Sequence, residues 1–392
     1  MPVNFQQIRE QIQQKLTQLE SRTQEKQDLL EKALNLLEEY SQKQNDLREL
    51  LNQVSHLASN LRCAEPSDEA LNGSFDEQPA PEHWILLAAD GSQIAPDPHR
   101  AVEFGVINTG LFAFQTGASP LERVKSEMLL FDELYPNHVP LGEEMLALQR
   151  DLRERGLLLT QALEFRQKEC PLITLTDGPL ELYRQPQQDD TLQKAFEDYL
   201  SVLSQMKKEG IITAGYVDRP RSDYVVSLLE LVILREAQSL RDAGKKRPLW
   251  GVRDVDLFSR ILAPGARSAL FGIHSLSAKR FSMDDEDLAL CFFYLNVGKQ
   301  ENPYIVRVEI PRFVAKHADR VALVQSILLD QCRQLSAHPY PYALHRAHEI
   351  AVVHYDERQV LENMLAMEIR RRGAEPGQVS HKQSHKDNIS RR

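Results

Sequence analysis

Two apolar runs far apart in the chain each end in an Asp-Gly pair. The first reads ILLAADG over residues 85–91, and the second reads LITLTDG over residues 172–178. Short apolar runs bounded by turn residues are typical of buried strands. Asp-Gly after a strand is also ordinary turn chemistry, because glycine accepts a positive φ and aspartate caps the turn. The pattern therefore leaves two interpretations of Asp90 and Asp177: a turn used twice, or two halves of one metal site.

The order of the expected elements indicates which strands become neighbours. The domain opens with a strand over residues 84–89 and a hairpin within residues 101–115, whose turn would lie at Asn108-Thr109-Gly110. Helices and strands then alternate over about 141–167, 171–176, 191–209 and 211–217, and a further helix runs through Leu240. A late strand pair (292–297, 305–310) and helices over 321–335 and 344–372 close the domain.

Consecutive strands followed by alternating helices and strands predict a mixed sheet with helices on its faces. This is the order of a ribonuclease H-like α/β fold. In that fold the first and fourth strands are neighbours, so Asp90 and Asp177 would lie side by side.

The N-terminal residues 3–65 contain neither glycine nor proline, and apolar residues recur there at helical spacing. They predict a long amphipathic helix or a helical hairpin with a coiled-coil seam, bent at the apolar-free stretch 20–28. Packing on its own domain and docking to a partner or a second copy both explain such a face. Residues 1–65 are thus expected as a helical extension, 66–83 as an acidic, Pro-rich linker, 84–372 as the main domain and 373–392 as a disordered tail.

Composition excludes several classes of protein. A formal net charge of −10 over 392 residues argues against a protein that coats nucleic acid non-specifically, although a local basic groove and an acidic metal site are compatible with it. The four cysteines show no CxxC spacing and predict reduced core thiols rather than a zinc site or disulfides. The polar N-terminus and the lack of a long apolar run predict a cytoplasmic protein without a membrane span.

Paired carboxylates carry the chemistry that we expect. Two carboxylates at neighbouring strand ends repel each other unless a cation lies between them, and hard divalent ions prefer oxygen ligands. Two such ions can activate a water and stabilise the leaving oxygen of a phosphodiester. A third ligand is expected from the helix over 141–167. We favour Glu154, which lies in mid-helix where one face must pack on the sheet, with Glu164 as the alternative. Surface charge explains any single glutamate there, including the others, Glu143, Glu144 and Glu169.

A histidine far downstream has suitable companions. Tyr340, Leu344 and His348 lie four residues apart, so on a continuous helix they would share one face, with Pro341 in its first turn. A neutral imidazole at His348 could bind a second ion or shuttle a proton, while a histidine of the core or of a helix cap is the alternative. His345 is the nearby competitor.

Basic residues in Gly- or Pro-rich turns are candidates for phosphate contacts, because their side chains could reach solvent there. They are Arg219, Arg221 and Arg267. The basic run 245–247 could line a DNA channel. Solvated surface is the alternative for all of them.

Four segments together resemble the NurA family of nucleases over roughly residues 84–372. They are AADGS (88–92), LITLTDGPL (172–180), GYVDRPRSDYVVSLL (215–229) followed by LFSRILAPGARSALF (257–271), and YPYALHRAHEIAVV (340–353). The resemblance implies a ribonuclease H-like core that cleaves DNA with Mn²⁺ or Mg²⁺, two ions being expected. It also implies 5′-to-3′ exonuclease and single-strand endonuclease action in DNA end resection for repair, beside a hexameric HerA-type ATPase that translocates DNA. A homodimer is expected.

Residue by residue, the resemblance assigns metal carboxylates to Asp90 and Asp177 and the helical glutamate to Glu154. It assigns the family's tyrosine and histidine to Tyr340 and His348. Two other functions stay open. One is a non-catalytic adaptor that scaffolds a repair complex through its N-terminal helix. The other is a phosphohydrolase with Asp90 as nucleophile, although that chemistry usually needs an aspartate two residues on, where this chain has Ser92.

Overall fold

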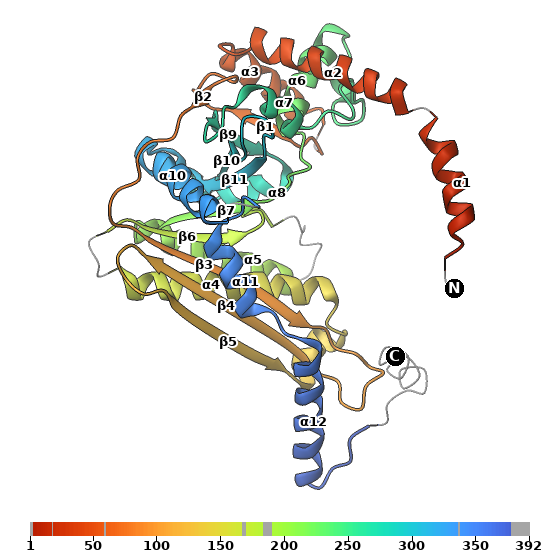
Figure 1. The fold of residues 1–392 in the computed structure, drawn as a ribbon, viewed down its shortest axis with the longest axis vertical. Coiled ribbons are helices and arrows are strands. Elements are labelled where there is room, and N and C mark those ends of the chain that lie inside the picture. Colours follow the sequence, from red (N-terminus) through yellow and green to blue (C-terminus); the bar gives the residue numbers. More distant parts are fainter. Residues whose placement is uncertain are drawn as a thin grey trace. The chain divides into compact units, whose positions relative to one another are not determined.

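The computed structural model describes residues 3–17, 19–58, 60–166, 170–182, 190–335 and 338–377. The chain forms two compact units, and Figure 1 labels their elements. Unit 1 comprises Met1–Gln78 and Val217–Ser326, and unit 2 comprises Pro79–Tyr216 and Ile327–Arg392. This division differs from the expected one, because residues 217–326 cluster with the N-terminal helices and not with the strands that precede them.

Unit 2 contains the mixed sheet that the sequence predicts. Its strand order is β7-β6-β3-β4-β5. β3 pairs antiparallel with β4, and β4 with β5, whereas β3, β6 and β7 run parallel. The first and fourth strands of this unit, β3 and β6, are therefore neighbours, which confirms the key expectation. The bounds are β3 Ile85–Ile94, β4 Gly105–Gln115, β5 Leu121–Leu129, β6 Leu172–Asp177 and β7 Ile212–Val217.

Helices cover both faces of this sheet. α4 (Glu143–Phe165) packs on β3, β4 and β6 and contacts α5 (Asp190–Lys208), while α11 (Tyr342–Ala351) packs on β3 and β4. A Cβ at Gly91 would point at α4, whereas one at Gly110, the partner of Asp90 in the ladder, would point at α11. Because side chains alternate along a strand, α4 and α11 lie on opposite faces (Figure 1).

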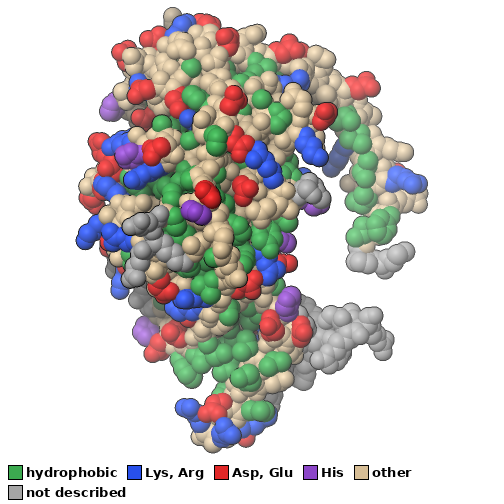
Figure 2. All heavy atoms as spheres, turned by 60° about the vertical axis from the view of Figure 1, so that its left-hand side comes forward, with side chains coloured by type: hydrophobic (Ala, Val, Ile, Leu, Met, Phe, Trp, Pro, Cys, Tyr) green, Lys and Arg blue, Asp and Glu red, His purple; other side chains and the backbone are tan. Residues whose placement is uncertain are grey.

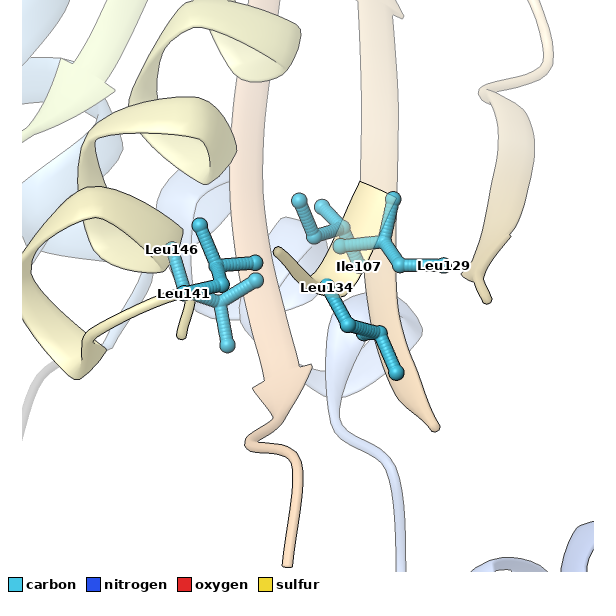
Figure 3. Close-up of a cluster of buried hydrophobic side chains, with 5 residues drawn as sticks. All are labelled: Ile107, Leu129, Leu134, Leu141 and Leu146. Atoms are coloured by element: carbon cyan, nitrogen blue, oxygen red, sulfur yellow. The ribbon is translucent and has the colours of Figure 1, made fainter. Parts of the chain in front are cut away.

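The start of α4 is held by a small apolar cluster at the edge of the sheet where β4 begins and β5 ends. Figure 3 shows its side chains converging from β4, the end of β5, a 3₁₀ turn and the beginning of α4. They are Ile107, Leu129, Leu134, Leu141 and Leu146, all buried. This contact fixes the first turn of α4 and so orients the rest of the helix along the sheet.

Two of the expected turns do not exist. The ladder between β3 and β4 runs without interruption from the pair Ile85–Gln115 to the pair Ile94–Val106, so Asp90-Gly91 and Asn108-Thr109-Gly110 all lie inside strands. Both turn predictions are wrong, because these residues accommodate the helices that pack on the sheet: Gly91 makes room for α4, and Asn108 and Gly110 contact α11. Asn108 donates a hydrogen bond to the carbonyl of Ala351 at the end of that helix (2.7 Å), and Gly110 leaves room for its backbone.

The expected C-terminal helix over 344–372 is divided in two. α11 ends at Ala351, and α12 (Tyr355–Arg371) begins after His354, whose backbone N–H donates to the Glu357 carboxylate at 2.7 Å. α12 exposes apolar side chains at Val360, Met364 and Met367, and the green surface of this helix is visible in Figure 2. Residues 378–392, most of the expected tail, lie outside the described residues.

Unit 1 contains the N-terminal helices α1 (Phe5–Leu16), α2 (Leu19–Glu39) and α3 (Gln44–Ser55). The expected bend at 20–28 is wrong: α2 runs through that stretch, whose Glu, Lys, Gln and Arg residues favour a helix, and the chain turns between α2 and α3 instead. The long coiled-coil extension is not confirmed. α2 and α3 pack on α6 (Tyr224–Glu236) of their own unit, whereas the described side chains of α1 are all exposed.

The strands of unit 1 form an antiparallel arrangement β1-β9-β10-β11, with β8 beside β10 and β2 beside β8. The late strand pair is confirmed as β10 and β11. The bounds are β1 Cys63–Pro66, β2 Ser74–Phe75, β8 Arg267–Ser268, β9 Phe271–His274, β10 Leu290–Asn296 and β11 Ile305–Pro311.

The stretch expected as a linker is folded over much of its length. It contains the end of β1, the strand β2 and the fully buried Leu71, and its continuously exposed part is residues 78–83. The remaining helices are α7 Asp254–Ile261, α8 Leu276–Lys279, α9 Arg312–Ala315 and α10 Ala318–Gln334, with 3₁₀ turns η1 Phe131–Leu134, η2 Pro136–His138, η3 Leu240–Asp242, η4 Arg280–Ser282 and η5 Glu286–Leu288. Among the described residues, no helix is both long and apolar enough to span a bilayer.

A buried carboxylate caps α6 from a distant part of the chain, and its loss should destabilise unit 1. Asp254 is fully buried and accepts hydrogen bonds from the backbone N–H groups of Val225 (3.1 Å) and Val226 (2.9 Å) and from the Tyr294 hydroxyl (2.6 Å). Asp254→Ala leaves the two backbone N–H groups without this acceptor and the Tyr294 hydroxyl with Ser222 alone (2.9 Å), so we expect the free energy of unfolding to fall by about 3 kcal/mol. Burial raises the pKa of Asp254 to about 7, and the neutral Asp254→Asn should lose less, because its amide oxygen can replace Oδ2 and accept from Val225 and Tyr294. Urea denaturation of both variants measures the difference, and equal losses would contradict the capping role.

Candidate active site

The expected carboxylates of unit 2 surround one pocket of about 550 Å³. Asp90 comes from β3, Glu154 from α4, Asp177 from the end of β6 and His348 from α11. The remaining lining residues are Gly91, Leu148, Arg150, Asp151, Arg155, Pro179, Glu181 and Leu182. Residues predicted from four separate segments therefore meet in one place.

Strand register explains why Asp90 and Asp177 lie together. The last paired residues of the parallel strands β3 and β6 are Ala89 and Thr176, and each aspartate is one residue beyond. Side chains at equivalent positions of neighbouring strands point to the same face. β6 ends at Asp177 while β3 continues to Ile94, so the pocket opens where the parallel pairing stops. Asp177 is exposed and Asp90 is partly buried.

His348 reaches the site because α11 crosses the sheet at a glycine. A Cβ at Gly110 would lie 2.6 Å from the Ala347 carbonyl oxygen and 2.7 Å from the Ala351 nitrogen. This close approach brings His348 Nδ1 within 2.7 Å of Asp90 Oδ2, in a hydrogen bond at the exposed rim of the pocket. The competitor His345 points elsewhere and lies 3.5 Å from Glu349.

Glu154 approaches β3 from the other face, and again a glycine makes room. A Cβ at Gly91 would lie 2.6 Å from Glu154 Oε1, which explains this glycine better than the turn that the sequence suggested. The Glu154 side chain is 6% exposed, and Oε1 has no hydrogen-bond donor, although Arg150 Nε lies 3.2 Å away. Burial, with a smaller effect of Asp151, raises the pKa of Glu154 to about 8. Because Glu154 Oε1 accepts no hydrogen bond, this carboxylate can still bind a cation.

Two arginines at the pocket were not predicted. Arg150 forms ion pairs with Asp151 (3.1 Å) and Glu154 (3.2 Å). Arg155 is buried, lies over the Tyr199 ring at 4.6 Å and donates to the carbonyl of Pro179 (3.1 Å), so it ties α4 to the loop after Asp177. Glu181 is a further buried carboxylate in the lining. The signal for the arginines was the charged run RDLRER at 150–155, which resembles an exposed helix face.

Other candidates lie outside the pocket. Glu164 is half exposed and pairs with Arg123 of β5 at 3.0 Å. Tyr340 precedes α11, so it does not share a helical face with His348 as expected. Its ring packs edge to face on Tyr216, with centroids 5.6 Å apart. Glu143 and Glu144 are exposed in the first turn of α4, and Glu169 lies outside the described residues.

The three arginine candidates for phosphate contacts belong to unit 1 and differ from one another. Arg219 and Arg221 are exposed, as the sequence suggests. The expectation that Arg267 reaches solvent is wrong: it is 7% exposed, forms a bidentate ion pair with Glu69 (3.0 and 2.9 Å) and stacks on Phe75. A guanidinium held in this way stabilises the folded unit and is not available to a phosphate.

The donor set fits a divalent cation in chemistry but is not gathered into a finished site. Among the described residues, no three His, Cys, Asp or Glu side chains are close enough to form a ready metal centre. The lone pairs that such an ion would use face cationic or hydrogen-bonding groups instead, Arg150 at Glu154 and His348 at Asp90. Hard cations prefer carboxylate oxygens, and Glu154 Oε1, which accepts no hydrogen bond, meets that preference in a pocket that two aspartates also line.

Comparison with known proteins identifies the family. A model of the NurA domain matches residues 85–353, well over half of the chain, and the protein therefore belongs to the NurA family. This confirms the resemblance inferred from the four sequence segments. No curated protein matches the chain.

Solved structures with a related arrangement are distant. The NurA nuclease from Sulfolobus solfataricus is 14% identical with a TM-score of 0.46, over 85% of this chain and 96% of that chain. The catalytic domain of human endonuclease V is 15% identical with a TM-score of 0.33, over 82% of this chain and 98% of that chain. The family assignment rests on the domain model alone.

Proposed function

We propose that this NurA-family protein is a divalent-metal-dependent DNA nuclease whose site is built from Asp90, Glu154, Asp177 and His348. The observation that carries the proposal is the meeting of two aspartates from neighbouring parallel strands with a buried glutamate at one open pocket, where Glu154 Oε1 accepts no hydrogen bond and has an ion pair with Arg150. Carboxylates placed in this way repel one another and favour a cation between them.

The side chains of the proposed site have different roles in the reaction. Asp90, Asp177 and Glu154 would hold the cation, Mn²⁺ or Mg²⁺ and two ions in the full site. When bound, such ions polarise the attacking water and the phosphodiester oxygens. A cation at Glu154 would compete with the guanidinium of Arg150, which would then be free to contact a phosphate oxygen. Asp90 orients the His348 ring through Nδ1, so this imidazole can move a proton at the pocket rim or bind the second ion. Tyr340 is kept as a candidate through the family motif alone.

The finer features of the proposal are supported by the family resemblance and not by the site. They are 5′-to-3′ exonuclease and single-strand endonuclease action, a role in DNA end resection and repair, and a HerA-type hexameric translocase as partner. A homodimer that acts in the cytoplasm belongs to the same proposal. Arg219 and Arg221 remain candidates for DNA contacts.

A cleavage assay tests the proposal. Full-length protein is incubated with end-labelled single- and double-stranded DNA in Mn²⁺, Mg²⁺ or EDTA. We expect degradation with either metal and none in EDTA. Absence of cleavage in every metal by a folded protein would overturn the nuclease and favour the adaptor alternative. The position of Glu154 in the same pocket as Asp90 and Asp177 favours the nuclease over the adaptor.

Gly91→Ala should separate activity from stability. The added Cβ would lie 2.6 Å from Glu154 Oε1 and 2.6 Å from Arg150 Cγ, atoms of side chains that can move, so the cost to folding should be only about 1 kcal/mol. The displaced Glu154 should nevertheless lower cleavage by about tenfold or more, because small misplacements of catalytic groups are costly. Rates and thermal unfolding measured together check this, and wild-type cleavage by the variant would contradict a role for Glu154.

A further inference from the structure

An exposed tryptophan in unit 1 is unusual for a well-packed loop. Trp250 is 75% exposed, whereas its neighbours Leu249 and Val252 are 0% and 2% exposed. Leu249 and Val252 therefore anchor the segment 244–253 in the core of the unit, whereas the indole of Trp250 is exposed to solvent. Burying a tryptophan contributes more apolar area than almost any other side chain, so leaving one outside suggests a ligand that covers it.

The loop conformation is fixed by the buried carboxylate of Glu230 and by the partly exposed ion pair of Arg247 with Asp223. The Leu249 backbone N–H donates to Glu230 Oε1 at 2.9 Å, and Arg247 binds both Glu230 (2.6 Å) and Asp223 (2.7 Å). The Val252 N–H closes a turn onto the Leu249 carbonyl at 3.1 Å, next to Gly251 with φ of 95°. The indole is thus held on a rigid turn and loses little conformational freedom when a ligand binds.

The segment that contains Trp250 is rich in basic residues, although the whole chain has a net charge of −10. Residues 241–253 contain one acidic residue, Asp242, and five basic ones: Arg241, Lys245, Lys246, Arg247 and Arg253. Lys245 and Lys246 are exposed, and Lys246 pairs with Asp242 at 2.7 Å. Two of the other basic residues are already paired: Arg247 with Glu230 and Asp223, and Arg253 with Asp256 (3.5 Å), which also binds Lys26 at 2.9 Å. The exposed lysines are therefore the cations of the loop that a ligand can reach. A tryptophan beside exposed ammonium groups can bind a flexible polyanion with aromatic rings, because the rings stack on the indole and the anionic groups contact the lysines.

We propose that the loop 244–253 binds single-stranded nucleic acid, with Trp250 as a stacking platform for a base and Lys245 and Lys246 as phosphate contacts. Bases stack on exposed aromatic side chains and the backbone follows cationic groups in single-strand-binding proteins generally. A duplex hides its bases, so a single strand is the form that this loop recognises. The inference rests on the proposed function for the nature of the polymer, but it concerns binding outside the pocket of Asp90 and Asp177.

The chain has two tryptophans, which makes the test direct. Trp84 is 4% exposed, so the emission that iodide quenches comes from Trp250. Full-length protein in EDTA is titrated with oligothymidylate while tryptophan emission is recorded, and affinity is measured separately by anisotropy of a labelled oligothymidylate. We expect saturable quenching of the emission and protection from iodide.

Variants define the contacts. Trp250→Ala should weaken binding about tenfold through lost stacking, whereas Trp250→Phe should stay within about twofold because it keeps an aromatic face. Replacing Lys245 and Lys246 by alanine should make the salt dependence of log K shallower by about 1.4, since two phosphate contacts are lost. Thermal unfolding of each variant confirms that it folds.

Wild-type affinity in Trp250→Ala, or an indole that iodide still quenches at saturating oligothymidylate, would overturn the proposal and leave a protein partner as the interpretation of the surface. Cleavage is assayed separately in Mn²⁺. If the protein cleaves DNA and Trp250→Ala binds oligothymidylate like the wild type, only the proposed binding by the loop 244–253 is refuted. If oligothymidylate binds at Trp250 but the protein never cleaves DNA, only the proposed nuclease activity is refuted.

Discussion

Replacing Asp90 by asparagine is expected to lower the rate of DNA cleavage by at least about a thousandfold, a loss of about 4 kcal/mol of transition-state stabilisation. Asparagine has the shape of aspartate but not its charge, so it binds a divalent cation poorly. The fold should survive. Asp90 is partly exposed, and the amide oxygen of asparagine can still accept from the Gly91 N–H, as Oδ1 does. The amide NH2 then takes the place of Oδ2 and can donate to His348 Nδ1 in the other tautomer of the ring.

The same helix and sheet provide the controls. Glu164→Gln removes a carboxylate of α4 that lies outside the pocket, and its cleavage should stay within about twofold of wild type, because an exposed ion pair contributes little. Asp177→Asn should be as severe as Asp90→Asn. The double variant should be hardly worse than either, since ligands of one site act as a unit. Metal-stimulated cleavage by the double variant would contradict the assignment.

Gly110→Ala is expected to affect both stability and activity. The added Cβ would lie 2.6 Å from the Ala347 carbonyl oxygen, 2.7 Å from the Ala351 nitrogen and 2.9 Å from Ile350 Cβ. Two of these are backbone atoms of α11, so the helix itself must move away from β4. Such overpacking lowers the free energy of unfolding by about 2–3 kcal/mol. The displaced helix also carries His348 away from Asp90, so we expect cleavage to fall by about a hundredfold.

A second glycine is the matched control. Gly156 lies within α4, where a Cβ would meet no described atom within 4 Å. Gly156→Ala should therefore leave cleavage unchanged and raise the free energy of unfolding by up to about 1 kcal/mol through helix propensity. Urea denaturation and initial cleavage rates of the two variants make the comparison. Equal behaviour of Gly110→Ala and Gly156→Ala would contradict the close packing of α11 on β4.

Much of the fold could be predicted because strand and helix patterns are local. The order of the elements predicted that the strands ending at Asp90 and Asp177 are neighbours, and β3 and β6 are paired, in parallel. The hairpin at Asn108-Thr109-Gly110 failed because the same residues that favour a turn also suit a strand crossed closely by a helix. The local sequence does not indicate that α11, more than 200 residues later, packs closely against Gly110.

The candidate site was predictable where a carboxylate lies on a regular element. Asp90, Glu154, Asp177 and His348 line one pocket. Arg150 and Arg155 were missed because a run of alternating charges in a helix normally faces solvent, and only the packing of α4 on the sheet draws them inward. Arg267 was predicted to reach solvent but is buried. Its partner Glu69 is about 200 residues away, in the stretch expected as a linker, so the local sequence did not indicate the ion pair.

Metal binding at the pocket is the central claim, and a crystal soaked in Mn²⁺ tests it most directly. Anomalous scattering locates manganese without any assumption about activity. We predict manganese in contact with carboxylate oxygens of both Asp90 and Asp177, with the Arg150 guanidinium moved away from Glu154. Manganese bound elsewhere, or an empty pocket in a protein that cleaves DNA with Mn²⁺, would contradict the account.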